Sequence, residues 1–204
     1  MPPPQAILSS GPDTTGGPCR AAPPPACNGN MHTEPELTAG TTPQLGRYDI
    51  DPDRSAVTFR TRHLFGLAPV RGTLAIRGGT VDITEPVTAS AVYAEIETGS
   101  LRSGYRPRDR SVRSSRFLNA ALYPLMIFSS TRVDAGDRVL TGALTVGAVS
   151  RPVSLSIVHY APSAGSFTAR ATARIDRNEY GVAAARGLAG RYLDITVEVQ
   201  CVRR

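Results

Sequence analysis

The chain has 204 residues, with 23 basic side chains, 17 acidic ones and three cysteines, and its formal net charge is +6. A chain of this length can bury a sufficient core without a disulfide or metal scaffold, and three cysteines are too few to build one. No run approaches the roughly 18 apolar residues of a membrane-spanning helix, and the first residues lack the basic and apolar segments of a secretory signal. We therefore expect a cytoplasmic protein with no integral membrane segment, whose charge permits an anionic partner without requiring one.

The composition changes near residue 46. Ten of the 17 prolines and six of the 19 glycines precede that point, so this stretch has little apolar surface to offset the entropy of ordering. We predict a disordered tail over residues 1–46 and one folded domain over residues 47–204. Cys19 and Cys27 lie in the tail at a spacing that is not typical of zinc sites, and we expect no metal and no cofactor.

From Tyr48 onward, apolar and polar residues alternate with a period of two, which indicates antiparallel strands with one solvated face. The pattern is clearest over residues 55–63, 89–98, 167–175 and 193–199, and further strands are expected over 69–77, 125–133, 138–146 and 152–160. Gly78-Gly79, residues 135–137 and residues 162–165 are predicted turns. Eight strands with one polar face each favour an all-β fold, an antiparallel barrel closed on itself.

Residues 107–123 interrupt the alternation and predict a short helix that packs apolar side chains against the barrel. Asp109 is the expected N-cap of this helix, and Pro124 follows its end. A second short helical piece is expected over residues 181–187.

The inward face of the predicted barrel contains several small residues, and two interpretations are open. Small residues leave room for an elongated apolar cavity, or bulky neighbours across the barrel fill the space. The residues concerned are Ala94, Gly142, Ala169, Ala171 and Ala173.

Two histidines fall on inward positions by parity. His63 follows Val57 and Phe59 on one strand, and His159 follows Leu155 and Ile157 on another. Each is either a hydrogen-bonded structural residue or a ligand contact, since no second histidine or acid stands at a metal-ligand spacing.

Residues 102–116 hold six arginines and one acid, Asp109. Three interpretations are open: a solvated segment without a partner, a site for an anionic head group that guanidinium groups bind bidentately, or a nucleic-acid surface. The last is disfavoured because aromatic residues are not interleaved as stacking platforms, so we expect no nucleic-acid partner. No catalytic motif with a nucleophile, paired carboxylates or a phosphate loop is present, and we expect no enzyme.

Five stretches, in order, resemble the YceI-like family of lipocalin-like polyisoprenoid-binding proteins. They are YDIDPDRSAVTFRTRHL, VRGTLAI, SLRSGYRPRDRSVRSSRFLNAALYPLMIFSST, GALTVGAVSRPVSL and IDRNEYG. Matching positions include Tyr48, Asp51, Pro52, His63, Gly72, Arg108, Asp109, Arg113, Phe117, Tyr123, Pro124, Gly142, Arg151, Asp176, Arg177 and Tyr180.

The resemblance implies an extended eight-stranded antiparallel lipocalin-like barrel, with one or two short helices, whose lumen takes a long isoprenoid or similar amphipathic lipid. The expected function is that of a non-catalytic carrier, and a homodimer is compatible with it. The alternative is a stress-related interaction module with a filled barrel. The predicted lumen contacts are Val57, Phe59, His63, Ile96, Leu144, Ala171 and Leu193, and the predicted head-group contacts are Arg108, Arg110 and Arg113.

Overall fold

The computed structural model describes residues 44–63, 67–184 and 189–204, and it describes His63 by its backbone alone. The chain divides into two units, Met1–Glu36 and Leu37–Arg204, and every described residue belongs to the second. The predicted tail over residues 1–46 therefore lies almost wholly outside the described residues. At its boundary, the first strand already begins at Gly46.

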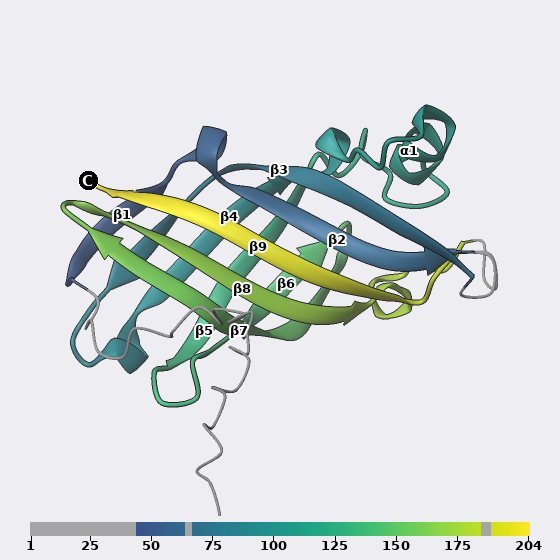
Figure 1. Cartoon of the computed structure of the whole chain (residues 1–204). Coiled ribbons are helices and arrows are strands. Elements are labelled where there is room, and N and C mark those ends of the chain that lie inside the picture. The colour runs from purple at the N-terminus through teal and green to yellow at the C-terminus, as the bar shows by residue number, and fades with distance from the viewer. Residues whose placement is uncertain (1–43, 64–66, 185–188) are drawn as a thin grey trace, which may run out of the picture. The chain divides into compact units, whose positions relative to one another are not determined.

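The described residues form nine antiparallel strands that close into one barrel (Figure 1). Strands β2 to β9 follow one another around the barrel, and β9 pairs with β2 to close it. β1 and β2 both lie between β3 and β9, and they pair with different stretches of these two strands. They therefore occupy a single position around the barrel, which has eight strand positions in all. The predicted fold class is confirmed. The strands are β1 Gly46–Ile50, β2 Ala56–His63, β3 Ala68–Ile83, β4 Ala91–Glu97, β5 Leu125–Asp134, β6 Val139–Val146, β7 Val149–Ser163, β8 Ser166–Asp176 and β9 Tyr192–Arg203.

The turn predicted at Gly78-Gly79 is wrong, because β3 runs straight through both glycines. The register of β3 against β4 shifts between Ile76 and Gly78, which marks a β-bulge. A Cβ atom on Gly79 would lie 2.1 Å from the carbonyl oxygen of Tyr93. These glycines therefore allow a close approach of two strands, and the chain does not reverse there.

A second bulge reverses the predicted orientation of His159. The register of β7 against β8 shifts between Ile157 and His159, so Val158 is an extra residue and is 43% exposed. Parity counted from Leu155 places His159 inside the barrel, whereas in the structure this side chain is exposed. One inserted residue moves every later side chain to the other face.

The connection between β4 and β5 contains the helix α1, Arg106–Arg113, which is shorter than the predicted segment over residues 107–123. Hydrogen-bonded turns follow it up to Tyr123. Asp109 is not the N-cap: Tyr105 holds that position, and Asp109 lies inside the first turn. Four 3-10 helices complete the described elements, namely η1 Pro52–Arg54, η2 Val87–Ala89, η3 Thr98–Ser100 and η4 Arg177–Tyr180.

A short helix, η4, lies just before the predicted helical piece over residues 181–187, of which residues 185–187 lie outside the described part of the chain. η4 ends at Gly181, whose φ of 75° is left-handed and stops the helix. No helix among the described residues is long and apolar enough to cross a bilayer.

Candidate ligand site in the barrel

Along the middle of the barrel, seven inward-facing side chains of β8 and β9 are apolar, yet they keep part of their surface accessible. They pack against the barrel core and are only half-buried, although the barrel is closed around them. Space that solvent can enter therefore adjoins this wall. The residues are Ala169, Ala171, Ala173, Leu193, Ile195, Val197 and Val199.

The adjoining wall, formed by β1 to β4 on the other side of β9, is packed. Val57, Phe59 and Ile96 are 7–8% exposed and belong to the central core. The predicted lumen residues therefore differ in exposure. Val57, Phe59 and Ile96 are covered by neighbouring side chains, whereas Leu144, Ala171 and Leu193 are half-buried. The side chain of His63 lies outside the described residues, and its predicted contact stays a prediction.

Two glycines on inward positions do not leave free space. A Cβ atom on Gly72 would lie 2.4 Å from Cζ of Phe59, and one on Gly142 would lie 2.6 Å from Cζ of Phe128. Both rings lie over the glycines, so bulky neighbours fill these places. The accessible surface belongs instead to the alanines of β8.

One end of the barrel is closed by aromatic packing. The ring centroid of Phe167 lies 5.0 Å from that of Tyr48 and 5.3 Å from that of Tyr160. Cys201 is fully buried beside them, and burial raises the pKa of its thiol to about 12, so the group stays neutral and inert. The half-buried positions run from this plug toward the other end of β8 and β9.

That other end, here called the loop end, carries the longer connections. It comprises the ends of the strands joined by the β2–β3, β4–β5 (residues 98–124), β6–β7 and β8–β9 connections, and Figure 1 shows α1 at the same end of the barrel as the arrowhead of β2. The connections at the opposite end are short hairpins, apart from the β3–β4 link that contains η2.

Residues 98–124, here called the basic lobe, form part of the barrel wall at the loop end. Strand β4 ends at Glu97, so the first half of β3 has no β4 partner, and backbone hydrogen bonds between Thr73 and Arg102 replace the ladder there. Leu101 is 5% exposed in the core, and Leu118 packs against the same core from the end of the basic lobe. The basic lobe is therefore continuous with the wall around the accessible space.

The three predicted head-group arginines have different environments. Arg108 donates from Nε to the hydroxyl of Ser103, 2.7 Å away, and from a second nitrogen to the Ser103 carbonyl. Arg113 donates to the Leu101 carbonyl at 3.0 Å, while its buried Nε–H has no acceptor. Arg110 is exposed. Two of the three guanidinium groups thus stabilise the basic lobe itself.

Asp109 completes this internal network. It is 6% exposed and accepts hydrogen bonds from the backbone N–H and the hydroxyl of Ser103. A buried carboxylate with these partners fixes the turn that precedes α1, a role different from the predicted helix cap.

The connection between β8 and β9 is held by Arg177, which the sequence pattern alone does not distinguish from other arginines. Its guanidinium donates to the carbonyls of Gly190 at 2.7 Å, Ala184 at 2.9 Å and Ala189 at 3.1 Å, and also to that of Val182. The position matches the resembled IDRNEYG stretch, which is the only sequence signal for it. Arg177 therefore fixes the loop beside the end of the accessible wall.

Asp176, next to Arg177, caps η4 and forms an ion pair. It accepts from the N–H of Asn178 at 3.0 Å and from Nε of Arg191 at 2.6 Å. Burial opposes ionisation, but these two donors outweigh burial and lower the pKa of Asp176. The carboxylate is thus charged over a wider pH range than usual.

A cleft of about 170 Å³ lies at the loop end between the basic lobe, the β6–β7 turn and η4. Its volume suits one ring or a short chain segment, and a pocket for a whole lipid chain is larger. The lining is formed by Phe117, Leu118, Tyr123, Val146, Tyr180 and Val182, with Ser115, Asn119, Gly147 and Ala148.

The chemistry of the accessible wall is apolar. The inward-facing residues from Ala169 to Ile175 on β8 and from Leu193 to Val199 on β9 are apolar. On β7, Arg151 lies opposite Leu144 and on the same face, at the loop end, where its Nε donates to the Glu179 carbonyl. Within the described ranges, no cluster of three or more His, Cys, Asp or Glu side chains is arranged to hold a metal ion. The arrangement can bind an apolar chain by burial.

Known proteins resemble this chain in sequence and in fold. The family model described as YceI-like domain matches residues 48–201. A UPF0312 protein of Enterobacter sp. (strain 638) is 30% identical over 168 residues, covering 77% of this chain and 86% of the relative. Protein YceI of Escherichia coli O17:K52:H18 is 38% identical over 113 residues, 53% of this chain and 59% of the relative.

Two solved structures share the barrel. BcnA of Burkholderia cenocepacia superposes with a TM-score of 0.64 at 17% identity, over 74% of this chain and 98% of BcnA. A polyisoprenoid binding domain from Saccharophagus degradans, implicated in plant cell wall breakdown, gives a TM-score of 0.58 at 14% identity, over 79% and 100%. With a family match that runs from the first strand of the barrel to the last, this chain belongs to the YceI-like family.

Proposed function

We propose that this protein is a non-catalytic carrier that holds a long isoprenoid or similar amphipathic lipid in its barrel. The observation that carries the proposal is the apolar, half-buried inner wall of β8 and β9 inside a closed barrel. Each CH₂ group that leaves water for such a wall contributes roughly 0.8 kcal/mol before the cost of ordering the chain.

The chain lies, in this proposal, along Leu144, Ala171 and Leu193, with its apolar end toward the aromatic plug. Val57, Phe59 and Ile96 belong to the adjoining packed wall, and His63 is the last residue of β2, at the loop end. The related domain from Saccharophagus degradans, which is described as polyisoprenoid-binding, supports the ligand class. The cytoplasmic location belongs to the same proposal and is checked by cell fractionation.

An anionic head group would lie near the basic lobe. Arg113 is the first candidate, because its buried Nε–H lacks an acceptor and a phosphate oxygen would satisfy it. Arg108 and Arg110 are the second and third candidates. Replacement of Arg108 and Arg113 by Gln is expected to weaken an anionic prenyl ligand more than a neutral one, and equal effects would remove this role.

The alternative is an interaction module with a filled barrel. The barrel is filled on one side only. Phe59 and Phe128 fill the space beside Gly72 and Gly142, and the β1 to β4 wall is packed. The half-buried alanines of β8 favour the carrier.

The direct test is native mass spectrometry and lipid extraction of the full chain, purified from its native host. Ala171→Phe inserts a ring into the accessible space and should reduce recovered lipid at least tenfold, while Ala171→Leu gives a smaller insertion if the larger one prevents folding. Thr168→Phe is the matched control, because Thr168 is exposed on the outer face of the same strand.

Two results would count against the carrier. One is a wild-type protein that neither copurifies with lipid nor binds long-chain prenyl compounds. The other is an Ala171→Phe variant that folds and binds as much lipid as the Thr168→Phe control.

A further inference from the structure

The outer surface of the basic lobe concentrates arginines that have no ionic partner. Arg102, Arg106, Arg110 and Arg116 are exposed, and within the described ranges none of them takes part in an ion pair. The single acid of the basic lobe, Asp109, is buried and bound to Ser103. The positive charge on this surface is therefore not neutralised locally.

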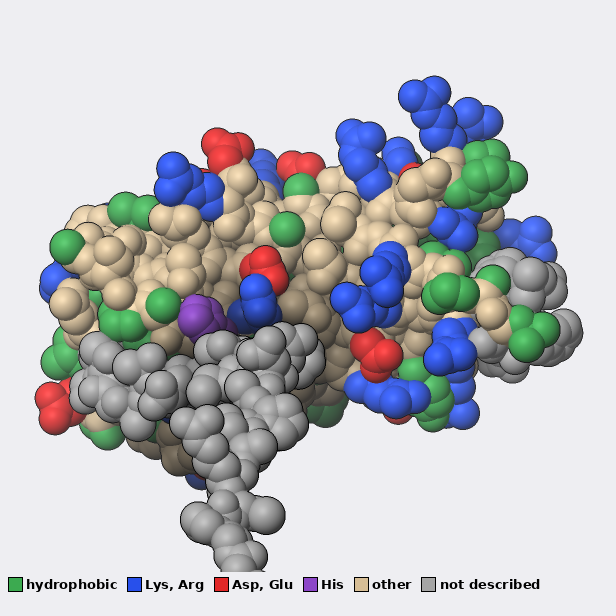
Figure 2. All heavy atoms as spheres, viewed as in Figure 1, with side chains coloured by type: hydrophobic (Ala, Val, Ile, Leu, Met, Phe, Trp, Pro, Cys, Tyr) green, Lys and Arg blue, Asp and Glu red, His purple; other side chains and the backbone are tan. Residues whose placement is uncertain are grey.

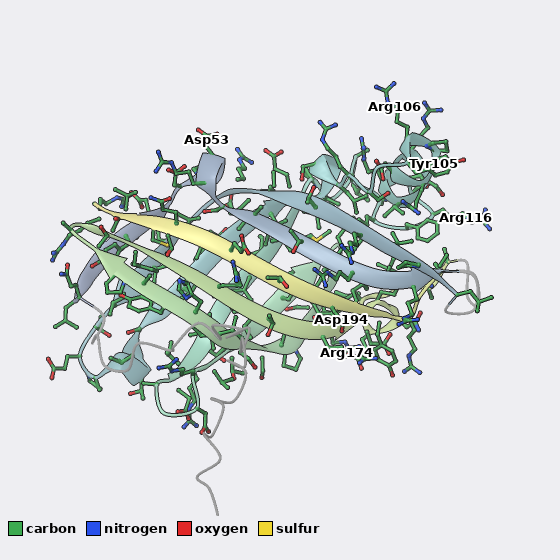
Figure 3. All side chains as sticks on the ribbon, in the orientation of Figure 1. Asp53, Tyr105, Arg106, Arg116, Arg174 and Asp194 are labelled. Atoms are coloured by element: carbon green, nitrogen blue, oxygen red, sulfur yellow. The ribbon has the colours of Figure 1, made fainter. Side chains whose placement is uncertain are left out.

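Two large apolar side chains of the basic lobe are also exposed. Tyr105 is 58% exposed at the start of α1, and Leu122 is 65% exposed at the end of the basic lobe. Figure 3 shows Tyr105, Arg106 and Arg116 projecting together from the loop end, and Figure 2 shows blue and green side chains gathered there. Apolar groups that stay exposed among cations indicate a contact surface.

The opposite end of the barrel has a different charge pattern. There Arg47 pairs with Asp82 at 3.5 Å, Arg132 with Asp134 at 3.6 Å and Arg204 with Asp49 at 3.1 Å. These three arginines lie beside acids, in contrast to the four exposed arginines of the basic lobe.

We propose that the basic lobe docks this protein onto the surface of an anionic lipid bilayer. Arginines bind lipid phosphates, while Tyr105 and Leu122 enter the head-group region, as amphipathic surface elements do. The purpose of the docking rests on the proposed function: the basic lobe is also part of the wall beside the accessible space, so docking brings that space to the membrane.

A lipid surface fits these side chains better than a nucleic acid does. The described part of the basic lobe exposes one well-exposed aromatic ring, Tyr105, and no series of rings on which bases stack. Leu122 has no role in base or phosphate recognition, whereas it gains from leaving water in a bilayer.

The test is flotation of the full chain with vesicles of phosphatidylcholine alone or rich in phosphatidylglycerol. Near an anionic surface each arginine contributes about fivefold to binding, so Arg106→Gln/Arg110→Gln/Arg116→Gln should weaken binding to the anionic vesicles by about a hundredfold. These three side chains are exposed, and none of them forms a side-chain hydrogen bond or ion pair within the part of the chain that the structure describes.

A variant with the same change of charge is the control. Arg54, Arg77 and Arg132 are 59–71% exposed and lie away from the basic lobe, in ion pairs of 3.6–4.0 Å. Their joint replacement by Gln should leave vesicle binding within about twofold, because it alters net charge without altering the docking surface. An equal loss in both triple variants would overturn the proposal.

Substitution of Leu122 measures the apolar contribution to membrane binding separately from the contribution of charge. Leu122→Ser should reduce the binding that persists at high salt, while Leu45→Ser, at a 45% exposed leucine outside the basic lobe, should not. Binding to phosphatidylcholine vesicles as strong as to anionic ones would contradict the docking mode, as would tighter binding to a short DNA duplex.

The same preparations separate this proposal from the carrier function. Native mass spectrometry measures bound lipid, and flotation measures docking. A protein that retains lipid and never floats with anionic vesicles overturns the docking alone. A protein that floats in the predicted way and never holds lipid supports the docking and overturns the carrier.

Discussion

Single arginines have distinct roles in this barrel, although all look alike in the sequence. Arg177 holds four backbone carbonyls, Arg113 holds one and leaves its Nε–H without an acceptor, and Arg110 is exposed. Their number and clustering are visible in the sequence, but the carbonyls that they meet lie 5–13 residues away in irregular connections, whose backbone path the sequence pattern does not predict. Those contacts are formed only by the folded chain.

Arg177→Lys should destabilise the protein by about 2 kcal/mol, because an ammonium group cannot reproduce the planar fork that meets several carbonyls. Chemical denaturation measures the change, and hydrogen exchange should accelerate at Val182 and Gly190. Arg170→Lys is the control: Arg170 pairs with Glu198 on the surface, and lysine keeps that pair. A loss no larger than that of the control would contradict the anchoring role.

The lowered pKa of Asp176 gives a pH dependence. Its stabilising contribution is complete above the usual carboxyl pKa of about 3.9 and is lost as the pH falls through the lower pKa of the folded state. Denaturation curves of wild type and Asp176→Asn should therefore converge in acid and differ at neutral pH. Arg191→Gln should move the convergence to higher pH, and an unchanged profile in that variant would show that the Arg191 ion pair does not lower this pKa.

Regular elements were predictable from the alternation of side chains, and their irregularities were not. The eight predicted strands and the closed barrel are confirmed, since a period of two requires only that each strand has a wet and a dry face. The bulges at Gly78-Gly79 and Val158 depend on the partner strand, so parity counted along one strand failed at His159. The divided lumen wall likewise depends on which rings cross the barrel.

Gly79→Ala should destabilise the barrel by about 3 kcal/mol or more, because its Cβ would lie 2.1 Å from the Tyr93 carbonyl oxygen and would separate β3 from β4. Thermal unfolding followed by circular dichroism measures the loss. In Gly99→Ala the new Cβ meets open space, so this control should change stability little. Equal unfolding temperatures in the two variants would show that the bulge tolerates a side chain.

At the scale of the whole molecule, the two ends of the barrel differ. The plug of Tyr48, Phe167 and Tyr160 closes one end, and the basic lobe, the anchored β8–β9 connection and the cleft lie at the other. Family membership and fold were accessible from five ordered sequence stretches. The difference between the two ends could not be predicted from the sequence, because it depends on which residues the closed barrel brings together at each end.

A ligand that enters the barrel should stabilise the whole domain, because it binds the folded state alone. The unfolding temperature of delipidated protein should rise with the concentration of a long-chain prenyl compound, by linkage of binding to folding. Ala171→Phe should abolish the rise, and Thr168→Phe should keep it. A rise of the same size in both variants would place the binding outside the lumen.

The pairing of β1 with β9 brings the first and last strands of the domain into contact. Tyr48 lies opposite Arg203, and Arg204 donates from its backbone N–H to the carbonyl of Arg47. A short peptide joining these neighbouring ends, with new ends cut in the turn at Gly136, would give a circularly permuted barrel with every strand neighbour retained. The order in which the strands are synthesised is therefore separable from the architecture that they build.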